Sequence, residues 1–124
     1  MRVIDSYGWI EYFTDGPLAK KYASFIEDAD NDNTTIPAVV VYEVYKRLKR
    51  ERGEQVALEA YAQLTRTKII PLDQETALNA ADTSLATGLA MADAIVYSTA
   101  KAHSAELITS NSHLKDLEGV KFIE

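Results

Sequence analysis

The chain of 124 residues contains no cysteine, which excludes disulfides, thiolate metal sites and thiol nucleophiles. It also has no apolar run long enough to cross a bilayer, and Asp5 interrupts the first apolar stretch, "MRVIDSYGWIEYF", almost at its start. We therefore expect neither export nor membrane insertion, and we expect a cytoplasmic protein, since the lack of cysteine is compatible with reducing conditions. This length fits one domain, which we expect to span residues 1–124.

Basic residues are outnumbered: 13 Lys and Arg stand against 19 Asp and Glu, so the net charge is −6. This balance argues against a nucleic-acid binder that relies on a broad basic surface. It does not exclude a nuclease, because a catalytic pocket of carboxylates is itself acidic until a metal fills it. One local concentration of basic residues, "KRLKRER" at 46–52, indicates either a solvated helix face or an RNA contact.

Short apolar segments alternate with longer segments that have helical spacing. The predicted strands are 2–5, 34–37, 68–72, 106–109 and 120–124. The predicted helices are 7–13, 17–29, 38–53, 54–66, 74–87 and 92–104, with a short helical turn at 113–117. Pro71 suggests that the third strand ends early or lies at an edge. The alternation predicts an α/β fold, a three-layer α/β/α sandwich with a mostly parallel central sheet.

Three acidic residues lie in stretches that otherwise resemble a hydrophobic core. Asp5 follows Val3 and Ile4, Glu43 is within "AVVVYEVY", and Asp93 lies between "LAMA" and "AIVY". Ionised carboxylates are rarely buried unless they are paired or bind metal. Parallel sheets bind ligands beyond the carboxyl ends of their strands, so a cluster of these acids at that edge would be a candidate site.

Each acid also has an ordinary structural explanation. Asp5 and Asp93 could each cap the helix that follows. Glu43 could form a helix ion pair with Lys46 or Arg47. Because caps and surface pairs do not require apolar surroundings, we favour a cluster of the three acids.

Clustered carboxylates need a compensating charge, since two of them about 4 Å apart repel by roughly 4 kcal/mol at an effective dielectric constant of about 20. A shared proton is one solution. For three acids without cysteine, a hard divalent cation such as Mg²⁺ or Mn²⁺ is the better one, because it prefers oxygen ligands and attracts phosphate. Such a site favours hydrolysis by an activated water, with a second ion available for the leaving oxygen.

The segments "VIDSYGWIEYF", "VVVYEVYKRL", "MADAIVYSTA" and "LITSNSHLKDLEGV" have an order and spacing that resemble a PIN domain, specifically a VapC-type toxin ribonuclease. The resemblance covers nearly the whole chain. It implies a PIN-like α/β/α sandwich, a Mg²⁺ or Mn²⁺ site and cleavage of RNA, with tRNA or rRNA as substrate. It also implies a homodimer that a cognate VapB-type antitoxin inhibits by inserting a C-terminal segment into the site.

By this resemblance Asp5, Glu43 and Asp93 are the metal ligands, and one of them helps to deprotonate the attacking water. Ser6 and Thr109 match small hydroxyl residues that accompany the first and fourth site positions. A turn hydroxyl and a strand-end residue explain these two equally well.

The fourth site position, where many members of the family have Asp, is Asn111 in this chain. Asparagine there is also a turn former, because it tolerates left-handed backbone and bonds its own turn. We favour a catalytic-site residue that has lost its charge, whose amide oxygen binds metal or orients water and whose neutrality weakens a second ion. Asp116 could compensate, but we expect it to be solvated.

His103 and His113 are too few for a multi-histidine zinc site but permit one acid-base histidine. His113 is near the predicted site, yet we expect it at the surface, since metal-assisted hydrolysis needs no histidine. We expect the helix aromatics in the core or at a dimer interface rather than stacked on bases: Trp9, Tyr12, Phe13 and Tyr61.

The leading hypothesis is a metal-dependent endoribonuclease that acts as the toxin of a type II toxin–antitoxin pair. The alternative is a PIN-like module, weakened by Asn111, that binds RNA or antitoxin without turnover. A phosphoryl-transfer domain of the haloacid dehalogenase or receiver kind is disfavoured. The first would need a second Asp where Tyr7 stands, and the second a Lys after a late strand, where "ITSN" has none.

Overall fold

The computed structural model describes residues 1–124 and places five short parallel strands in one layer. These are β1 (Arg2–Ile4), β2 (Thr35–Pro37), β3 (Lys68–Ile70), β4 (Glu106–Thr109) and β5 (Val120–Phe122). Strands β1, β4 and β5 form one parallel group and β2 and β3 another, and a parallel bridge between Arg2 and Thr34 joins the two groups. The order across the layer is therefore β5-β4-β1-β2-β3, which confirms the predicted parallel sheet.

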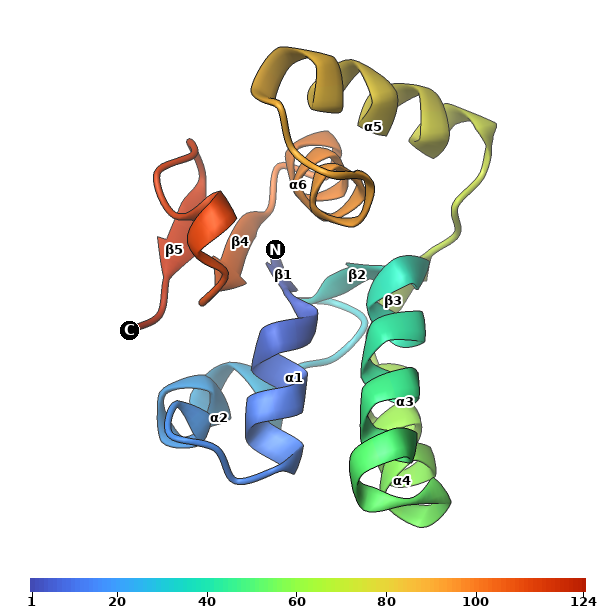
Figure 1. The fold of residues 1–124 in the computed structure, drawn as a ribbon, viewed down its shortest axis with the longest axis vertical. Helices are drawn as coiled ribbons and strands as arrows, with labels where there is room; N and C mark the ends of the chain where they lie inside the picture. Colours follow the sequence, from blue (N-terminus) through green and yellow to red (C-terminus); the bar gives the residue numbers. More distant parts are fainter.

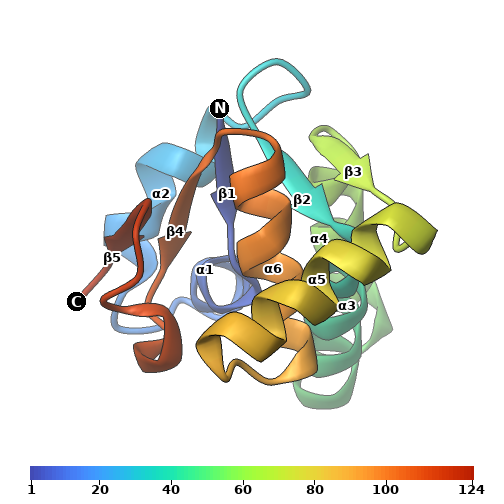
Figure 2. The ribbon, with the colours of Figure 1, turned by 90° about the horizontal axis from the view of Figure 1, so that it is seen from above.

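Helices cover both faces of this layer. They are α1 (Ser6–Phe13), α2 (Ala19–Glu27), α3 (Ala38–Arg52), α4 (Glu54–Leu64), α5 (Gln74–Thr87) and α6 (Met91–Ala102), with a 3-10 turn η1 (Ser112–Leu114). Figure 1 shows α5 and α6 above the strands and α1 to α4 below them, and Figure 2 shows the strands running beneath α6. The predicted three-layer α/β/α sandwich is confirmed.

Helix α3 forms directly after β2, although Val39, Val40 and Val41 are β-branched and reduce helix propensity. Its fully buried side chains, Val40, Val44 and Leu48, recur every four residues and face the core. The free energy gained by burying these three side chains outweighs the low helix propensity of the valines. Gly53 follows at φ 92°, a backbone conformation that favours glycine, and lets the chain turn into α4.

The core is one cluster of 23 buried residues, and Trp9 is among its largest fully buried side chains. The indole Nε1–H donates to the Ile4 carbonyl at 3.1 Å, which ties α1 to β1 and so fixes the junction that carries Asp5. Tyr12 and Phe13 pack against this cluster as expected. Tyr61 on α4 is 43% exposed and is not part of the core.

Strand β3 ends before Pro71 and is outermost in the strand order, as the proline predicts. No helix of the structure has both the length and the hydrophobicity needed to cross a bilayer.

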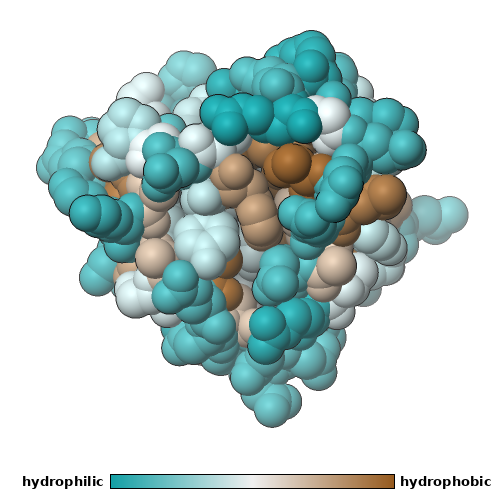
Figure 3. Space-filling model, turned by 90° about the horizontal axis from the view of Figure 1, so that it is seen from below, coloured by the Kyte–Doolittle hydropathy of each residue, from teal (hydrophilic) through white to brown (hydrophobic).

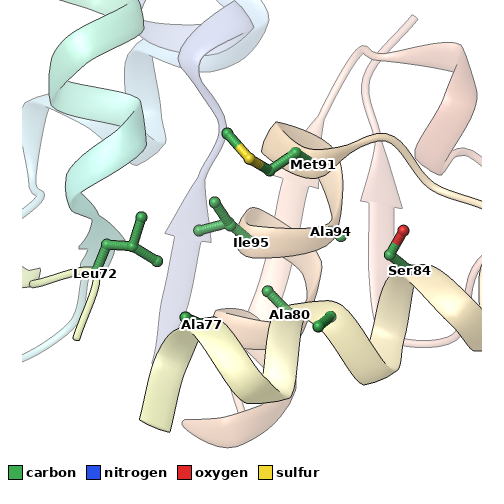
Figure 4. Close-up of a pocket in the computed structure, with 8 residues that line it drawn as sticks. Leu72, Ala77, Ala80, Ser84, Met91, Ala94 and Ile95 are labelled. Carbon is green, nitrogen blue, oxygen red and sulfur yellow. The ribbon is translucent and has the colours of Figure 1, made fainter. Parts of the chain in front are cut away.

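The outer surface of the lower helix layer is mainly hydrophilic but has an apolar region near the centre and right of the view in Figure 3. On the opposite layer, an apolar cavity of about 310 Å³ lies between α5 and α6. Figure 4 shows Ala77 and Ala80 of α5 facing Ile95 of α6, with Met91 and Leu72 at the margins. This cavity begins beside the first turn of α6, where Asp93 lies.

Candidate functional site

Asp5 is buried at the carboxyl end of β1, where it is 3% exposed. Its Oδ1 accepts the Ser6 backbone N–H at 2.7 Å, so it caps α1, as one of its two explanations predicted. Its Oδ2 accepts the Thr109 hydroxyl at 2.7 Å, which joins the ends of β1 and β4. Burial raises the pKa of Asp5 and the negative charge of Asp93 raises it further, although the Thr109 and Ser6 bonds act in the opposite direction. No basic side chain pairs with Asp5.

Glu43 lies partly buried in the second turn of α3. The predicted ion pair with Lys46 or Arg47 is wrong, because Arg47 Nε instead bonds Glu51 at 2.8 Å. Burial raises the pKa of Glu43, and the charge of Asp5 adds to this effect. Glu43 is therefore a second carboxylate without a cationic partner, and it lines a hollow together with Ser6, the neighbour of Asp5.

Asp93 lies in the first turn of α6 and does not cap that helix. The cap interpretation is wrong because the helix begins at Met91, so that Ala90 occupies the cap position. One carboxylate oxygen of Asp93 accepts the Asn111 amide N–H at 3.0 Å, and the other lies 3.4 Å from His113 Nδ1. Asp93 is thus fixed from the β4 side of the sheet.

Asn111 is buried, and its side chain and backbone N–H make three hydrogen bonds. Its Oδ1 accepts the His113 backbone N–H at 3.0 Å, its Nδ2 donates to Asp93, and its own N–H donates to the Thr109 hydroxyl at 2.9 Å. The backbone is extended, with φ −78°, so left-handed tolerance plays no part. The expectation that the amide oxygen faces the site is corrected, because that oxygen closes the turn and the amide nitrogen faces the carboxylate.

These bonds form one continuous chain from Asp5 through Thr109 and Asn111 to Asp93. An amide suits position 111 because it must accept an N–H on one side and donate to a carboxylate on the other, which a carboxylate cannot do. Thr109 is therefore more than a strand-end residue, since its hydroxyl holds both Asp5 and the Asn111 turn.

The two histidines lie apart in the fold, His113 beside Asp93 and His103 at the end of α6. His113 is 76% exposed, as expected, and its Nδ1 lies 3.4 Å from a carboxylate oxygen of Asp93. His103 ends α6, where its Nδ1 lies 2.9 Å from the Thr99 carbonyl oxygen. Asp116 is exposed and forms no ion pair, as expected for a solvated side chain.

Tyr7, which the sequence did not indicate as a site residue, is 48% exposed in the first turn of α1. Burial raises the pKa of its hydroxyl, and the charges of Asp5, Asp93 and Glu43 raise it further, in that order. Tyr7 lines the same hollow as Ser6 and Glu43, so it lies beside the carboxylates. The available signal was its position two residues after Asp5, on the turn that Asp5 caps.

No three acidic or histidine side chains come close enough together to enclose an ion by themselves. The donor set nevertheless fits a hard divalent cation, because Asp5 and Glu43 are desolvated carboxylates without a cationic partner. Mg²⁺ typically uses one or two protein carboxylates and keeps several waters, so a closed cage of three side chains is not required. Asp5, Glu43 and Asp93 are the residues that would hold it.

Several solved structures have this fold. A toxin–antitoxin complex from Klebsiella pneumoniae is 24% identical with a TM-score of 0.80, and the match covers 98% of this chain and 96% of that one. VapC20 from Mycobacterium tuberculosis, described as a sarcin-ricin loop cleaving toxin, is 11% identical with a TM-score of 0.75, covering 93% and 92%. VapBC2 from Rickettsia felis, bound to a promoter DNA fragment, is 16% identical with a TM-score of 0.74, covering 99% and 98%.

No curated protein sequence matches the chain. The PIN domain family, in contrast, matches residues 2–120, which is nearly the whole sequence. The chain belongs to the PIN domain family.

Proposed function

We propose that this PIN domain is a metal-dependent endoribonuclease of the VapC toxin type that hydrolyses RNA phosphodiester bonds. The observation that carries the proposal is the chain of hydrogen bonds that joins the buried Asp5 to Asp93 through Thr109 and Asn111, together with the lack of a basic partner for Asp5 and Glu43. RNA as the substrate is supported by the likeness to toxin–antitoxin proteins, one of which is described as cleaving the sarcin-ricin loop. We expect tRNA or rRNA to be the target.

Mg²⁺ or Mn²⁺, when bound, would supply the positive charge that activates water and neutralises the phosphate. Asp5 and Asp93 are suited to hold it, because Thr109 and Asn111 fix their orientations. Burial raises the pKa of Glu43, although a hydrogen bond with the Ser6 side chain acts in the opposite direction. These features suit Glu43 to accept the proton of the attacking water while also facing the metal site.

The alternative function is a module that binds RNA or antitoxin without turnover. Asn111 favours it, because a neutral residue at this position removes one charge from the metal site. Against it, Asn111 is hydrogen-bonded through both its amide nitrogen and its amide oxygen, and its amide nitrogen holds Asp93 in place. We therefore retain Asn111 as a positioning residue of the proposed catalytic site.

A VapB-type antitoxin and a second copy of the chain are the protein partners that we propose. For the homodimer, the face between α5 and α6 is the candidate surface, because it combines the apolar cavity with large exposed side chains. These are Leu72, Leu78, Leu85 and Met91, which are 52%, 68%, 87% and 74% exposed.

Light scattering should give the mass of a dimer for the parent protein and of a monomer for the double variant Leu85→Glu/Met91→Glu, because a charge would be buried at the contact. Leu58→Glu on α4, where the side chain is 49% exposed, is the matched control and should remain a dimer. A parent protein that is monomeric at micromolar concentration would exclude this part of the proposal.

Metal binding can be tested without reference to cleavage, by thermal unfolding in chelator and in Mn²⁺. A site that is saturated about 100-fold above its Kd stabilises the fold by about 2.7 kcal/mol, so the parent should show a clear rise in Tm. Asp93→Asn should remove most of this rise, whereas Asp116→Asn, which changes the same charge at an exposed position, should keep it. An equal rise in all three proteins would place the metal elsewhere.

A further inference from the structure

The basic segment of α3 is the one sequence motif that the proposed site does not use. Residues 46–52 contain five Lys or Arg and one acid, in a chain whose net charge is −6. Arg47 is paired with Glu51, but Lys46 and Arg50 form no ion pair. Two uncompensated cations therefore stand on one helix of an acidic protein.

These cations line a hollow of about 320 Å³ between α1 and α3, which run side by side in Figure 1. Glu43 and Ser6, the neighbour of Asp5, belong to the lining, and so do Lys46 and Arg50. Because Glu43 precedes Lys46 by one turn and Arg50 by two, the hollow leads from the carboxylates toward the basic end of the helix.

Tyr42, Lys46 and Arg50 follow one another at four-residue intervals, so they form a stripe along α3 with steps of about 6 Å. We call these three residues the α3 stripe. Tyr42 is 61% exposed, and Lys46 Nζ lies 3.2 Å from its hydroxyl and 5.3 Å from the centre of its ring. Tyr7 of α1 also lines the hollow and is 48% exposed.

Unpaired cations attract phosphate, and exposed aromatic rings accept stacked bases of any sequence. The combination is suited to single-stranded RNA, whose bases are free to stack, rather than to a duplex. The position beside the carboxylates adds a further reason. A polyanion that approaches Asp5 and Glu43 is repelled by them, and Lys46 and Arg50 supply the opposing charge within one or two helical turns.

We propose that the α3 stripe and Tyr7 bind the single-stranded RNA segment adjoining the scissile bond. Phosphates contact Lys46 and Arg50, and bases stack on Tyr42 and Tyr7. The location of the scissile bond rests on the proposed function, whereas the binding of RNA by the stripe does not. The binding experiment is therefore made in chelator, where no cleavage is expected.

The charge contribution is measured by fluorescence anisotropy with a short labelled single-stranded RNA of mixed sequence, as a function of salt. Each phosphate contact contributes about 0.7 to the slope of log K against log salt for single strands. Lys46→Ala/Arg50→Ala should therefore weaken binding and reduce the slope by about 1.4. The control Lys20→Ala/Lys101→Ala removes the same charge from exposed positions on α2 and α6 and should bind like the parent.

The aromatic contribution is measured with the same RNA. Tyr42→Ala should weaken binding about tenfold, whereas Tyr42→Phe, which keeps the ring, should bind within about twofold of the parent. Tyr61→Ala on α4, which removes another exposed tyrosine, should have no effect. Equal losses in Tyr42→Ala and Tyr61→Ala would contradict stacking on the stripe.

The outcomes separate this inference from the proposed function. RNA binding that depends on the stripe, in a protein that never cleaves, would support the stripe and overturn the nuclease. Metal-dependent cleavage, with stripe variants that bind RNA as their controls do, would overturn the stripe and leave the nuclease intact. If the stripe variants keep RNA affinity but lose binding of a labelled oligoglutamate peptide, the stripe serves an acidic protein segment and the inference is wrong.

Discussion

Asp5→Asn is expected to abolish RNA cleavage and, at the same time, to raise the thermal stability of the metal-free protein. Loss of groups that only support metal ligands lowers activity by about 10- to 100-fold, so loss of a ligand should lower it by at least about 100-fold. The stability gain has a separate origin. The Asp5 carboxylate is 3% exposed and has no cationic partner, so its charge is costly at neutral pH.

The stability effect of Asp5→Asn should depend on pH, in a direction set by the raised pKa. Because the folded-state pKa of Asp5 lies above its ordinary value of 3.8, the folded protein holds this proton more tightly than the unfolded chain. The associated stability is fully present below pH 3.8 and is lost as the pH rises through the folded pKa. Asp5→Asn has no carboxyl group to ionise at this position, so it does not lose this stability. The difference in Tm between variant and parent should therefore grow between pH 3.8 and neutrality.

Asparagine is the suitable substitution because its side-chain oxygen still accepts the Ser6 N–H and so keeps the cap of α1. Asp116→Asn is the control, since its carboxylate is exposed and should affect neither cleavage nor Tm. If Asp5→Asn cleaves RNA as well as the parent does, the proposed mechanism is wrong. If it lowers Tm instead, the hydrogen bond from Thr109 outweighs the buried charge.

Asn111→Asp is expected to make the protein less stable in chelator and more responsive to metal. The substitution removes the amide N–H that Asp93 accepts at 3.0 Å and places a second carboxylate in its position. At about 4 Å and an effective dielectric constant of about 20, such a pair repels by roughly 4 kcal/mol. A divalent cation relieves this repulsion, so the rise in Tm produced by Mn²⁺ should exceed that of the parent.

Asn111→Ala is the control for Asn111→Asp, because it also removes the N–H that Asp93 accepts but adds no charge; it additionally removes the acceptor of the His113 N–H. It should lose stability in chelator but gain nothing in its response to Mn²⁺. Identical behaviour of the Ala and Asp variants would mean that the charge at position 111 does not reach the metal site. Cleavage by Asn111→Asp alone, with an inactive parent, would select the function of a binding module without turnover.

The strands and helices follow closely from local patterns, because each buried face repeats with its own period. Even α3 forms as predicted, because the buried side chains of Val40, Val44 and Leu48 recur with helical spacing. Their burial favours a helix despite the low helix propensity of valine. The helix ends differ by one or two residues. At α6 the start of the helix decides the role of Asp93, because Asp93 could be the cap only if the helix began at Ala94, whereas it begins at Met91 and Asp93 lies in its first turn.

The candidate site was only partly predictable, because its decisive contacts join residues far apart in sequence. The partner of Asp93 is Asn111, 18 residues away, and that of Asp5 is Thr109, 104 residues away. No local pattern indicates that Asn111 donates its amide to a carboxylate and turns its oxygen into the 3-10 turn. For Glu43 a local pattern was misleading. Helical spacing suggested an ion pair with Arg47, but Arg47 pairs with Glu51 instead.

The most direct test of the proposed function is to incubate the purified protein, freed of antitoxin, with a mixed pool of tRNA and ribosomal RNA in Mg²⁺ or Mn²⁺. The control is the same reaction in excess chelator. We expect discrete RNA fragments with metal and none with chelator, which would show that Asp5, Glu43 and Asp93 suffice for catalysis beside a neutral Asn111. Intact RNA in the presence of either metal, or equal cleavage in chelator, would contradict a metal-dependent ribonuclease.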